Sequence, residues 1–220
     1  MTWTIPNTLT LLRLLAAPGV AVMFLYFHRP WADWFALALF VGAAITDWFD
    51  GYLARLWKQE SKFGAMLDPI ADKAMVVIAI MVLTGYNGMT PWLILPATII
   101  LFREVFVSGL REYLGPRAQL KVTKLAKWKT TAQMVAIATL FLGTGLEYLN
   151  GIKMQGMTPE QYAEAVTAGL ADPIRACGRR DCASTANLVG LWLIWLAAAL
   201  TAATGWEYFR KAQPYLREDK

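Results

Sequence analysis

Four aspartates stand close together in a chain that is otherwise mostly apolar. They are Asp47, Asp50, Asp68 and Asp72, and hydrophobic residues make up 57% of the sequence. A carboxylate in or near a bilayer is costly and therefore marks a functional site by default. Carboxylate oxygens suit Mg²⁺ and Mn²⁺, and two such ions can clamp a phosphoryl group during an in-line displacement. The aspartates thus indicate metal-assisted phosphoryl transfer.

The spacing of these aspartates places them on helix faces beside small residues. Positions three, four, seven and eight residues apart share one face of a helix. One such face carries Asp47, Asp50, Gly51, Ala54 and Arg55, and a second carries Gly64, Asp68 and Asp72. Small side chains leave room for a ligand beside the backbone. We expect the two helices to be antiparallel neighbours whose four carboxylates face each other.

Other interpretations of the aspartates remain open at this point. Arg55 and Lys73 could neutralise two carboxylates, and the group would then be an ion-pair cluster that locks two helices together. That interpretation does not explain the small residues on the same faces. The carboxylates could also line the ion pathway of a cation-coupled transporter, which needs neither the glycines nor the arginine. An intramembrane prenyltransferase would carry two separated Asp-rich stretches, whereas this chain has one compact group.

The fixed residues also match a known signature. They read Asp47-x2-Asp50-Gly51-x2-Ala54-Arg55-x8-Gly64-x3-Asp68-x3-Asp72. At every fixed position this pattern resembles the signature of the CDP-alcohol phosphotransferase family. The resemblance implies an enzyme that transfers a CDP-activated phosphoryl group to an alcohol, with CMP as the leaving group.

The resemblance also implies roles for individual residues. Asp47, Asp50 and Asp68 would bind one metal ion. Asp47 and Asp68 would bridge to a second ion, which Asp72 would also bind. Asp72 would also be the general base that takes the proton of the acceptor hydroxyl as it attacks the β-phosphorus. The implied CDP contacts are Gly51, Arg55 and Ser61. Two Mg²⁺ or Mn²⁺ ions are thus the expected cofactors, and a homodimer is the expected assembly.

Composition predicts an all-α integral membrane protein. Charged residues make up 17% of the 220 residues, below the ~25% usual for a soluble domain. Six apolar stretches approach the ~20 residues that a spanning helix needs, at 9–27, 31–55, 68–86, 91–113, 130–149 and 186–205. Pro69 would lie in the first turn of the third helix, where its missing N–H costs little. The sequence shows no internal repeat, so one membrane domain, residues 1–220, is expected.

The positive charges predict the orientation in the membrane. The net charge of +5 could suggest a nucleic-acid partner, but Lys and Arg flank the apolar stretches, as they do in cytoplasmic loops. Lys and Arg are frequent after the second and fourth stretches and in the C-terminal tail. The first loop contains one Arg, Arg29, and the third loop contains none. Both termini and the aspartates would therefore face the cytoplasm of a bacterial inner membrane, with residues 150–185 outside. Polar residues at the cytoplasmic helix ends predict a polar cavity open to that side.

Other stretches indicate the acceptor. IPNTLTLLRLLAAPGV, FREVFVSGLREYL and AKWKTTAQ resemble the members of the family that join CDP-diacylglycerol to sn-glycerol 3-phosphate. An acceptor phosphate needs cations, and Arg can bind it bidentately. The expected acceptor-phosphate ligands are Arg103, Arg111, Lys127 and Lys129. Another phosphorylated polyol, such as inositol phosphate, remains an alternative acceptor, and the lysines could instead contact lipid headgroups.

Several further residues have more than one interpretation. Asn7, Thr10 and Arg13 could lie near the nucleotide, but Asn7 could also cap a helix and Arg13 could anchor it at the interface. Cys177 and Cys182 would form a disulfide in an oxidising compartment. Residues 158–170 could form a short amphipathic helix.

Overall fold

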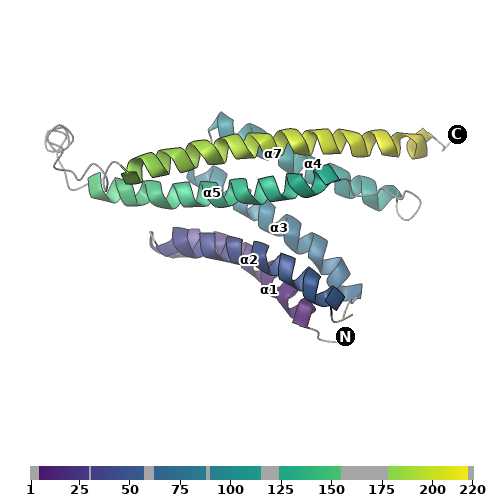
Figure 1. Ribbon diagram of the computed structural model, residues 1–220, viewed down its shortest axis with the longest axis horizontal. Coiled ribbons are helices and arrows are strands. Elements are labelled where there is room, and N and C mark those ends of the chain that lie inside the picture. The colour runs from purple at the N-terminus through teal and green to yellow at the C-terminus, as the bar shows by residue number, and fades with distance from the viewer. Residues whose placement is uncertain are drawn as a thin grey trace.

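The computed structural model describes residues 5–29, 31–56, 62–87, 90–114, 124–154 and 178–217. Within them the chain forms six α-helices, which confirms the prediction of an all-α protein (Figure 1). The helices are α1 (Ile5–Tyr26), α2 (Trp31–Leu56), α3 (Lys62–Tyr86), α4 (Pro91–Leu114), α5 (Lys124–Met154) and α7 (Gly178–Arg217). The helix predicted at 158–170, Cys177 and the side chain of Cys182 lie outside the described residues.

Four of the described helices have the length and apolar character of membrane-spanning helices. Four stretches are long and apolar enough to cross a bilayer: Asn7–Tyr26, Pro91–Leu114, Trp128–Leu149 and Thr185–Tyr215. The described part of α2 adds a shorter apolar segment, Trp31–Thr46. Large apolar side chains lie exposed on these helices, such as Leu25, Trp92 and Trp192. A soluble monomer rarely exposes so much apolar surface, whereas a multi-pass membrane protein presents it to lipid.

Helix boundaries differ from the predicted ones where a helix continues beyond its apolar stretch. Hydropathy marks only the part of a helix that crosses the bilayer, whereas backbone hydrogen bonding continues into the polar region. α3 therefore begins at Lys62 rather than at residue 68, and the prediction that Pro69 lies in its first turn is wrong because Pro69 lies inside the helix. α5 and α7 both extend into the segment expected as a loop, 150–185.

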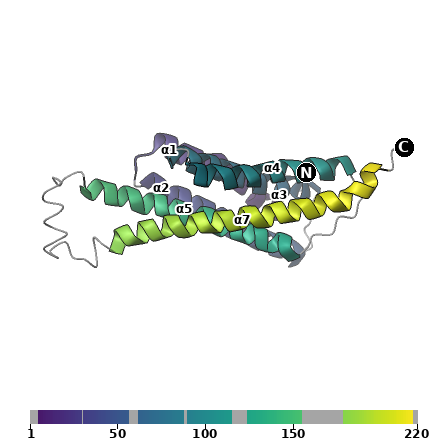
Figure 2. The same ribbon diagram turned by 90° about the horizontal axis from the view of Figure 1, so that it is seen from above.

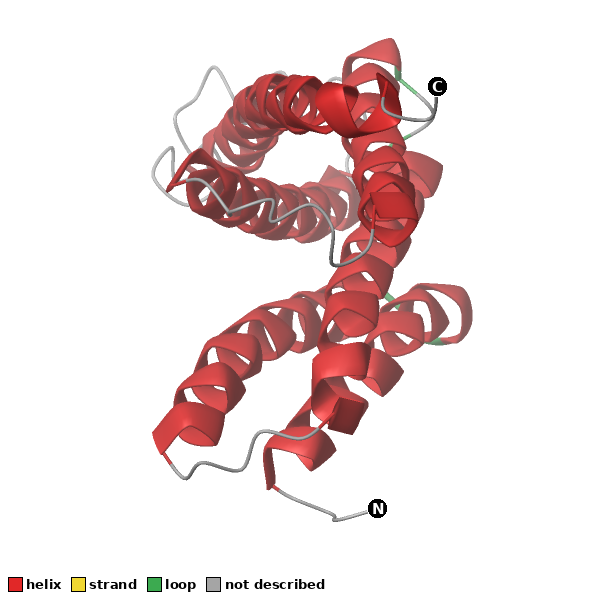
Figure 3. Cartoon of the chain, turned by 90° about the vertical axis from the view of Figure 1, so that its right-hand side faces the viewer, coloured by secondary structure: helices red, strands yellow, loops and turns green. Residues whose placement is uncertain are grey.

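The helices run alternately along the bundle, and the start of α1 and the end of α7 lie toward the same end (Figures 1 and 2). α1 packs along both α2 and α3, while α7 packs along α5 and α4. Figure 3 shows the same helices viewed along the bundle, from the end where α7 finishes. The prediction that α2 and α3 are direct neighbours is wrong over the described residues, where their contact is slight. A short loop brings two helix ends together but does not require packing along their length.

Close packing fixes α5 against α7 and against the α1–α2 pair. A Cβ on Gly190 of α7 would come within 2.8 Å of the Leu140 side chain, so the absence of a side chain permits this approach. Small residues at such contacts are typical of helix packing in bilayers. The ring of Phe141 lies 5.8 Å, centroid to centroid, from the rings of Phe24 and Phe40. These contacts join helices that are distant in sequence into one core.

A buried ion pair lies at the connection between α1 and α2, at the end of the bundle away from the start of α1. Asp33, which is 1% exposed, accepts two hydrogen bonds of 2.8 Å from Arg29. Arg29 also donates to the carbonyl oxygen of Thr144 at 3.2 Å, and its guanidinium lies 4.3 Å from the ring centroid of Tyr148. The one arginine of the first loop therefore ties α2 to α5.

Candidate active site

Asp68 and Asp72 lie one turn apart on α3, and an arginine from α1 binds both. Nη1 of Arg13 lies 2.9 Å from Oδ1 of Asp72, and Nη2 lies 3.5 Å from Oδ1 of Asp68. Thr10 donates a hydrogen bond of 2.7 Å to Oδ1 of Asp68. The Arg13 side chain is 2% exposed, whereas those of Asp68 and Asp72 are 50% and 46% exposed. One face of α1 thus fixes both carboxylates and leaves each about half accessible.

These contacts correct two interpretations of the sequence. Arg13 is not an interfacial anchor, because it is buried against the aspartates of α3. Lys73 pairs with no aspartate among the described residues, since its Nζ instead donates to Oγ of Ser108 on α4. The sequence had suggested Arg55 and Lys73 as the cations that offset the acids. The structure shows that Arg13 is the cation that pairs with the two acids on α3.

The remaining predicted ligands are only partly described. Asp47, Asp50, Gly51 and Arg55 belong to the helical backbone of α2, but their side chains lie outside the described residues, as does all of Ser61. Among the side chains that are described, no three from His, Cys, Asp and Glu come together. That finding does not include Asp47 and Asp50. The four-carboxylate site therefore stays a prediction, of which the structure describes the α3 half.

The described half fits a divalent cation. Asp68 and Asp72 present carboxylate oxygens on one face of α3, as their shared contact with Arg13 shows. Oxygen donors are those that Mg²⁺ and Mn²⁺ prefer. Because both side chains are about half exposed, a cation can reach them without any rearrangement of the core.

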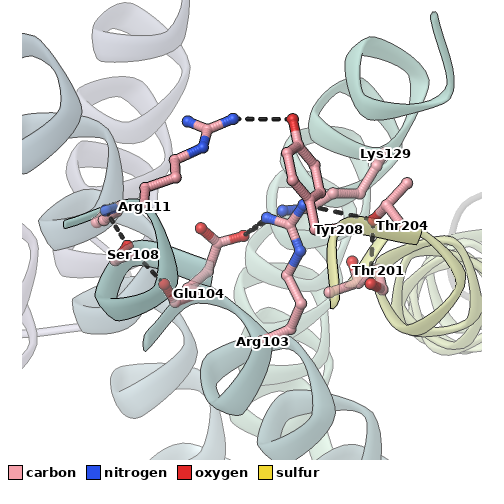
Figure 4. A network of polar contacts seen from close by, with 9 residues as sticks. Arg103, Glu104, Ser108, Arg111, Lys129, Thr201, Thr204 and Tyr208 are labelled. Carbon is pink, nitrogen blue, oxygen red and sulfur yellow. Dashed lines mark hydrogen bonds and ion pairs between the residues drawn. The ribbon is translucent and has the colours of Figure 1, made fainter. Parts of the chain in front are cut away.

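A second polar group lies between α4, α5 and α7 (Figure 4). Nζ of Lys129 donates to Oε1 of Glu104, and Nη1 of Arg103 lies 3.3 Å from the same oxygen. Arg111, two turns after Arg103, donates a hydrogen bond of 2.8 Å from Nη2 to the Tyr208 hydroxyl. We call Arg103, Glu104, Arg111 and Lys129 the cation cluster. Among the described residues, the carboxylate of Glu104 contacts Arg103 and Lys129 but no ion pair with Arg111 is found. The cluster therefore has more positive than negative charge, which an anion can neutralise.

Ser108 connects the cation cluster to the aspartates. It lies one turn after Glu104 on α4, and its Oγ donates to the carbonyl oxygen of Glu104 at 2.7 Å. The same Oγ accepts a hydrogen bond from Nζ of Lys73, which directly follows Asp72 in α3. The cations and the carboxylates are therefore neighbouring parts of one region. Lys127 belongs to α5, but its side chain is not described.

The sequence interpretation missed the residues that α7 contributes. Tyr208 is 3% exposed and contacts Arg111, while Oγ1 of Thr204 lies 3.5 Å from Nη2 of Arg103. The predicted sixth span ended at residue 205 and so left Tyr208 out. A signal was present, because Thr201, Thr204 and Tyr208 recur at intervals of three and four, as one helix face requires. A polar stripe on an apolar helix indicates a face turned toward the protein interior.

Comparison with known proteins gives one consistent family. The family described as CDP-alcohol phosphatidyltransferase matches residues 3–203. A protein of Cereibacter sphaeroides named CDP-diacylglycerol--glycerol-3-phosphate 3-phosphatidyltransferase is 78% identical over 221 residues, which cover 100% of both chains. Proteins of the same name from Shigella flexneri serotype 5b and Salmonella choleraesuis are 40% and 48% identical, over 78% and 64% of this chain and 100% and 78% of their own. This chain therefore belongs to the CDP-alcohol phosphatidyltransferase family.

Proposed function

We propose that this protein transfers the phosphatidyl group of CDP-diacylglycerol to sn-glycerol 3-phosphate, which gives phosphatidylglycerophosphate and CMP. The observation that carries the proposal is the position of the cation cluster beside Asp68 and Asp72, connected through the contact of Lys73 with Ser108. A phosphorylated alcohol needs cations for its phosphate and a carboxylate for its hydroxyl. The printed names of the similar proteins support the same pair of substrates.

In this reaction the acceptor phosphate is bound by the three cations of the cation cluster, Arg103, Arg111 and Lys129, together with Lys127. Asp72 accepts the proton of the acceptor hydroxyl as its oxygen attacks the β-phosphorus of CDP-diacylglycerol, and the bond to CMP breaks. Arg13 orients Asp72 through its contact of 2.9 Å. The CDP group is bound by Gly51, Arg55 and Ser61. Fixed geometry of this kind converts an encounter of two substrates into a reaction within one complex.

The metal ions belong to the same proposal. The residues that would hold two Mg²⁺ or Mn²⁺ ions are Asp47, Asp50, Asp68 and Asp72. When bound, these ions would neutralise negative charge on the phosphates of the nucleotide. The half-exposed carboxylates of α3 support this assignment, because a purely structural ion-pair group would have no need of accessible oxygens.

We further propose that the site faces the cytoplasm of a bacterial inner membrane. The alternating helices bring the start of α1, the end of α7, and the ends of α2 and α4 that precede α3 and α5 to one end of the bundle (Figure 1). The sequence next to these helix ends is rich in Lys and Arg, as is typical of cytoplasmic segments. A polar cavity would open at that end, and residues 150–185 would lie outside. The chain would form one domain, surrounded by membrane lipids, and two copies would assemble as a homodimer.

The function is tested by offering the purified protein several acceptors. With CDP-diacylglycerol and sn-glycerol 3-phosphate, we expect CMP and a lipid with the mass of phosphatidylglycerophosphate. Choline, ethanolamine and serine should give no product, because none of them brings a phosphate to the cation cluster. If the reaction with inositol phosphate is faster, inositol phosphate and not sn-glycerol 3-phosphate is the acceptor. Ion flux into vesicles without CMP release would instead indicate a cation-coupled transporter.

Loss of an acceptor-binding cation is expected to affect one substrate only. Arg111→Ala removes a charge-assisted hydrogen bond to the acceptor phosphate, worth about 1.5–3 kcal/mol. The KM for sn-glycerol 3-phosphate should therefore rise about 10- to 150-fold if the bond is equally strong in the ground and transition states. Arg103→Ala should act similarly, although it also releases Glu104 from its 3.3 Å contact. Steady-state kinetics in both substrates measure this effect.

The matched control is Arg210→Ala, which removes an exposed arginine from the C-terminal part of α7. Arg210→Ala should leave both KM values unchanged, since no phosphate site includes it. The KM for CDP-diacylglycerol should also stay constant in Arg103→Ala and Arg111→Ala. If those two variants instead raise the KM for CDP-diacylglycerol and leave the KM for sn-glycerol 3-phosphate unchanged, the acceptor site has been placed wrongly.

A further inference from the structure

We propose that Tyr208 of α7 is a positioning residue that aligns Arg103 and Arg111 for the acceptor phosphate. The inference rests on the proposed function and adds to it a residue from the last helix. It also assigns α7 a part in acceptor recognition, beyond its packing against α4 and α5. Tyr208 lies beside the guanidinium groups of both arginines (Figure 4).

Tyr208 contacts both arginines of α4. Its hydroxyl accepts the 2.8 Å hydrogen bond from Nη2 of Arg111. The guanidinium carbon of Arg111 lies 5.1 Å from the ring centroid, and that of Arg103 lies 5.6 Å from it. Both distances fall within the ~6 Å range of a cation–π interaction. Because Tyr208 is 3% exposed, the ring itself has little freedom to move.

This arrangement addresses a cost of anion binding by two arginines. Two guanidinium groups repel each other, and each long side chain carries about 2 kcal/mol of rotamer entropy that binding would remove. A tyrosine ring attracts both cations through its negative face, and its hydroxyl fixes the direction of one of them. The two cations are thereby held close together before a ligand arrives, which makes binding stronger because less order remains to be imposed.

The backbone of α7 supports the stem of Arg103 next to this ring. A Cβ on Gly205 would come within 3.0 Å of Cγ of Arg103, so a larger residue there would push the stem aside. Thr204, on the same side, lies 3.5 Å from Nη2 of Arg103. Nε of Arg103 is buried and has no hydrogen-bond partner in the part of the chain that the structure describes. The Arg103 guanidinium therefore retains hydrogen-bonding capacity that its described neighbours do not use.

The test compares Tyr208→Phe with wild type. Phenylalanine keeps the ring beside both guanidinium groups but removes the acceptor for Arg111. We expect the KM for sn-glycerol 3-phosphate to rise about 3- to 10-fold, a smaller change than direct loss of a phosphate ligand gives, because the tyrosine acts through the arginine. The inhibition constant of inorganic phosphate, measured as a competitor of sn-glycerol 3-phosphate, should rise by the same factor. Tyr208→Ala also removes the ring and should raise both constants further.

Controls separate positioning from a general structural role. Tyr215→Phe removes a hydroxyl from an exposed tyrosine on the same helix and should change neither constant. The kcat, the KM for CDP-diacylglycerol and the Tm should stay near wild-type values in Tyr208→Phe. If Tyr208→Phe leaves the KM for sn-glycerol 3-phosphate within twofold of wild type, or raises both KM values equally, Tyr208 is not a positioning residue for the acceptor.

The two proposals fail in different ways. If the wild-type protein does not use sn-glycerol 3-phosphate at all, the proposed function is wrong, and this inference is wrong with it. Suppose that wild type uses that acceptor and that Arg111→Ala raises its KM while Tyr208→Phe does not. The proposed function then stands, and only the role assigned to Tyr208 is overturned.

Discussion

Removal of divalent cations with EDTA is expected to lower CMP release to background, and Mg²⁺ or Mn²⁺ is expected to restore it. Among the described side chains, Arg13 contacts both the Asp68 and the Asp72 carboxylate, and Asp47 and Asp50 add two further acids to the predicted site. CDP-diacylglycerol adds two phosphates. Like charges about 4 Å apart near a protein surface repel by about 4 kcal/mol per pair, and this repulsion opposes both binding and reaction. Activity measured against free metal concentration tests the prediction.

Metal binding should also be visible without turnover. A ligand that binds only the folded state raises stability by mass action, so Mg²⁺ should raise the Tm of wild type in detergent. It should raise the Tm of Asp68→Asn much less. EDTA alone should not unfold the protein, because Arg13 already contacts both described acids. Full turnover by protein that contains less than one divalent ion per chain would contradict the assignment of a metal site.

The all-α fold and the approximate position of each helix could be predicted from the sequence because they depend on local properties. A run of apolar residues long enough to cross a bilayer leaves the backbone no alternative to helix. The spacing of Asp68 and Asp72 likewise places them on one face of whichever helix contains them. The start of α3 was misplaced because hydropathy does not report where a helix ends in the polar region.

The partners of the site residues could not be predicted, because they depend on how the helices pack. Arg13 and Asp72 are separated by 59 positions in the sequence, and Arg111 and Tyr208 by 97. A carboxylate in a membrane protein indicates that a cation lies nearby, but several Lys and Arg side chains are close to the aspartates in the sequence. Packing of α1 along α3 and of α7 along α4 selects among them.

Replacement of Asp72 by Asn is expected to lower kcat by a factor of about 10²–10⁴, the usual contribution of a general base. Asparagine has nearly the same shape, and its Oδ1 can still accept the hydrogen bond that Arg13 donates to Asp72 at 2.9 Å. It cannot take up the proton of the acceptor hydroxyl. The expected defect is therefore in the chemical step, with the KM for sn-glycerol 3-phosphate nearly unchanged. Single-turnover kinetics at saturating substrates measure that step.

Loss of metal could imitate the loss of the base, because Asp72 is also an expected metal ligand. Asp68→Asn is the matched comparison, since Asp68 lies one turn away, contacts the same arginine and is about equally exposed. If Asp68 serves only as a ligand, high Mg²⁺ should restore most of the activity of Asp68→Asn, in proportion to the metal content measured in the same samples. The kcat of Asp72→Asn should stay low even when its metal content equals that of wild type. Equal recovery of both variants at high Mg²⁺ would show that Asp72 only binds metal and that the base lies elsewhere.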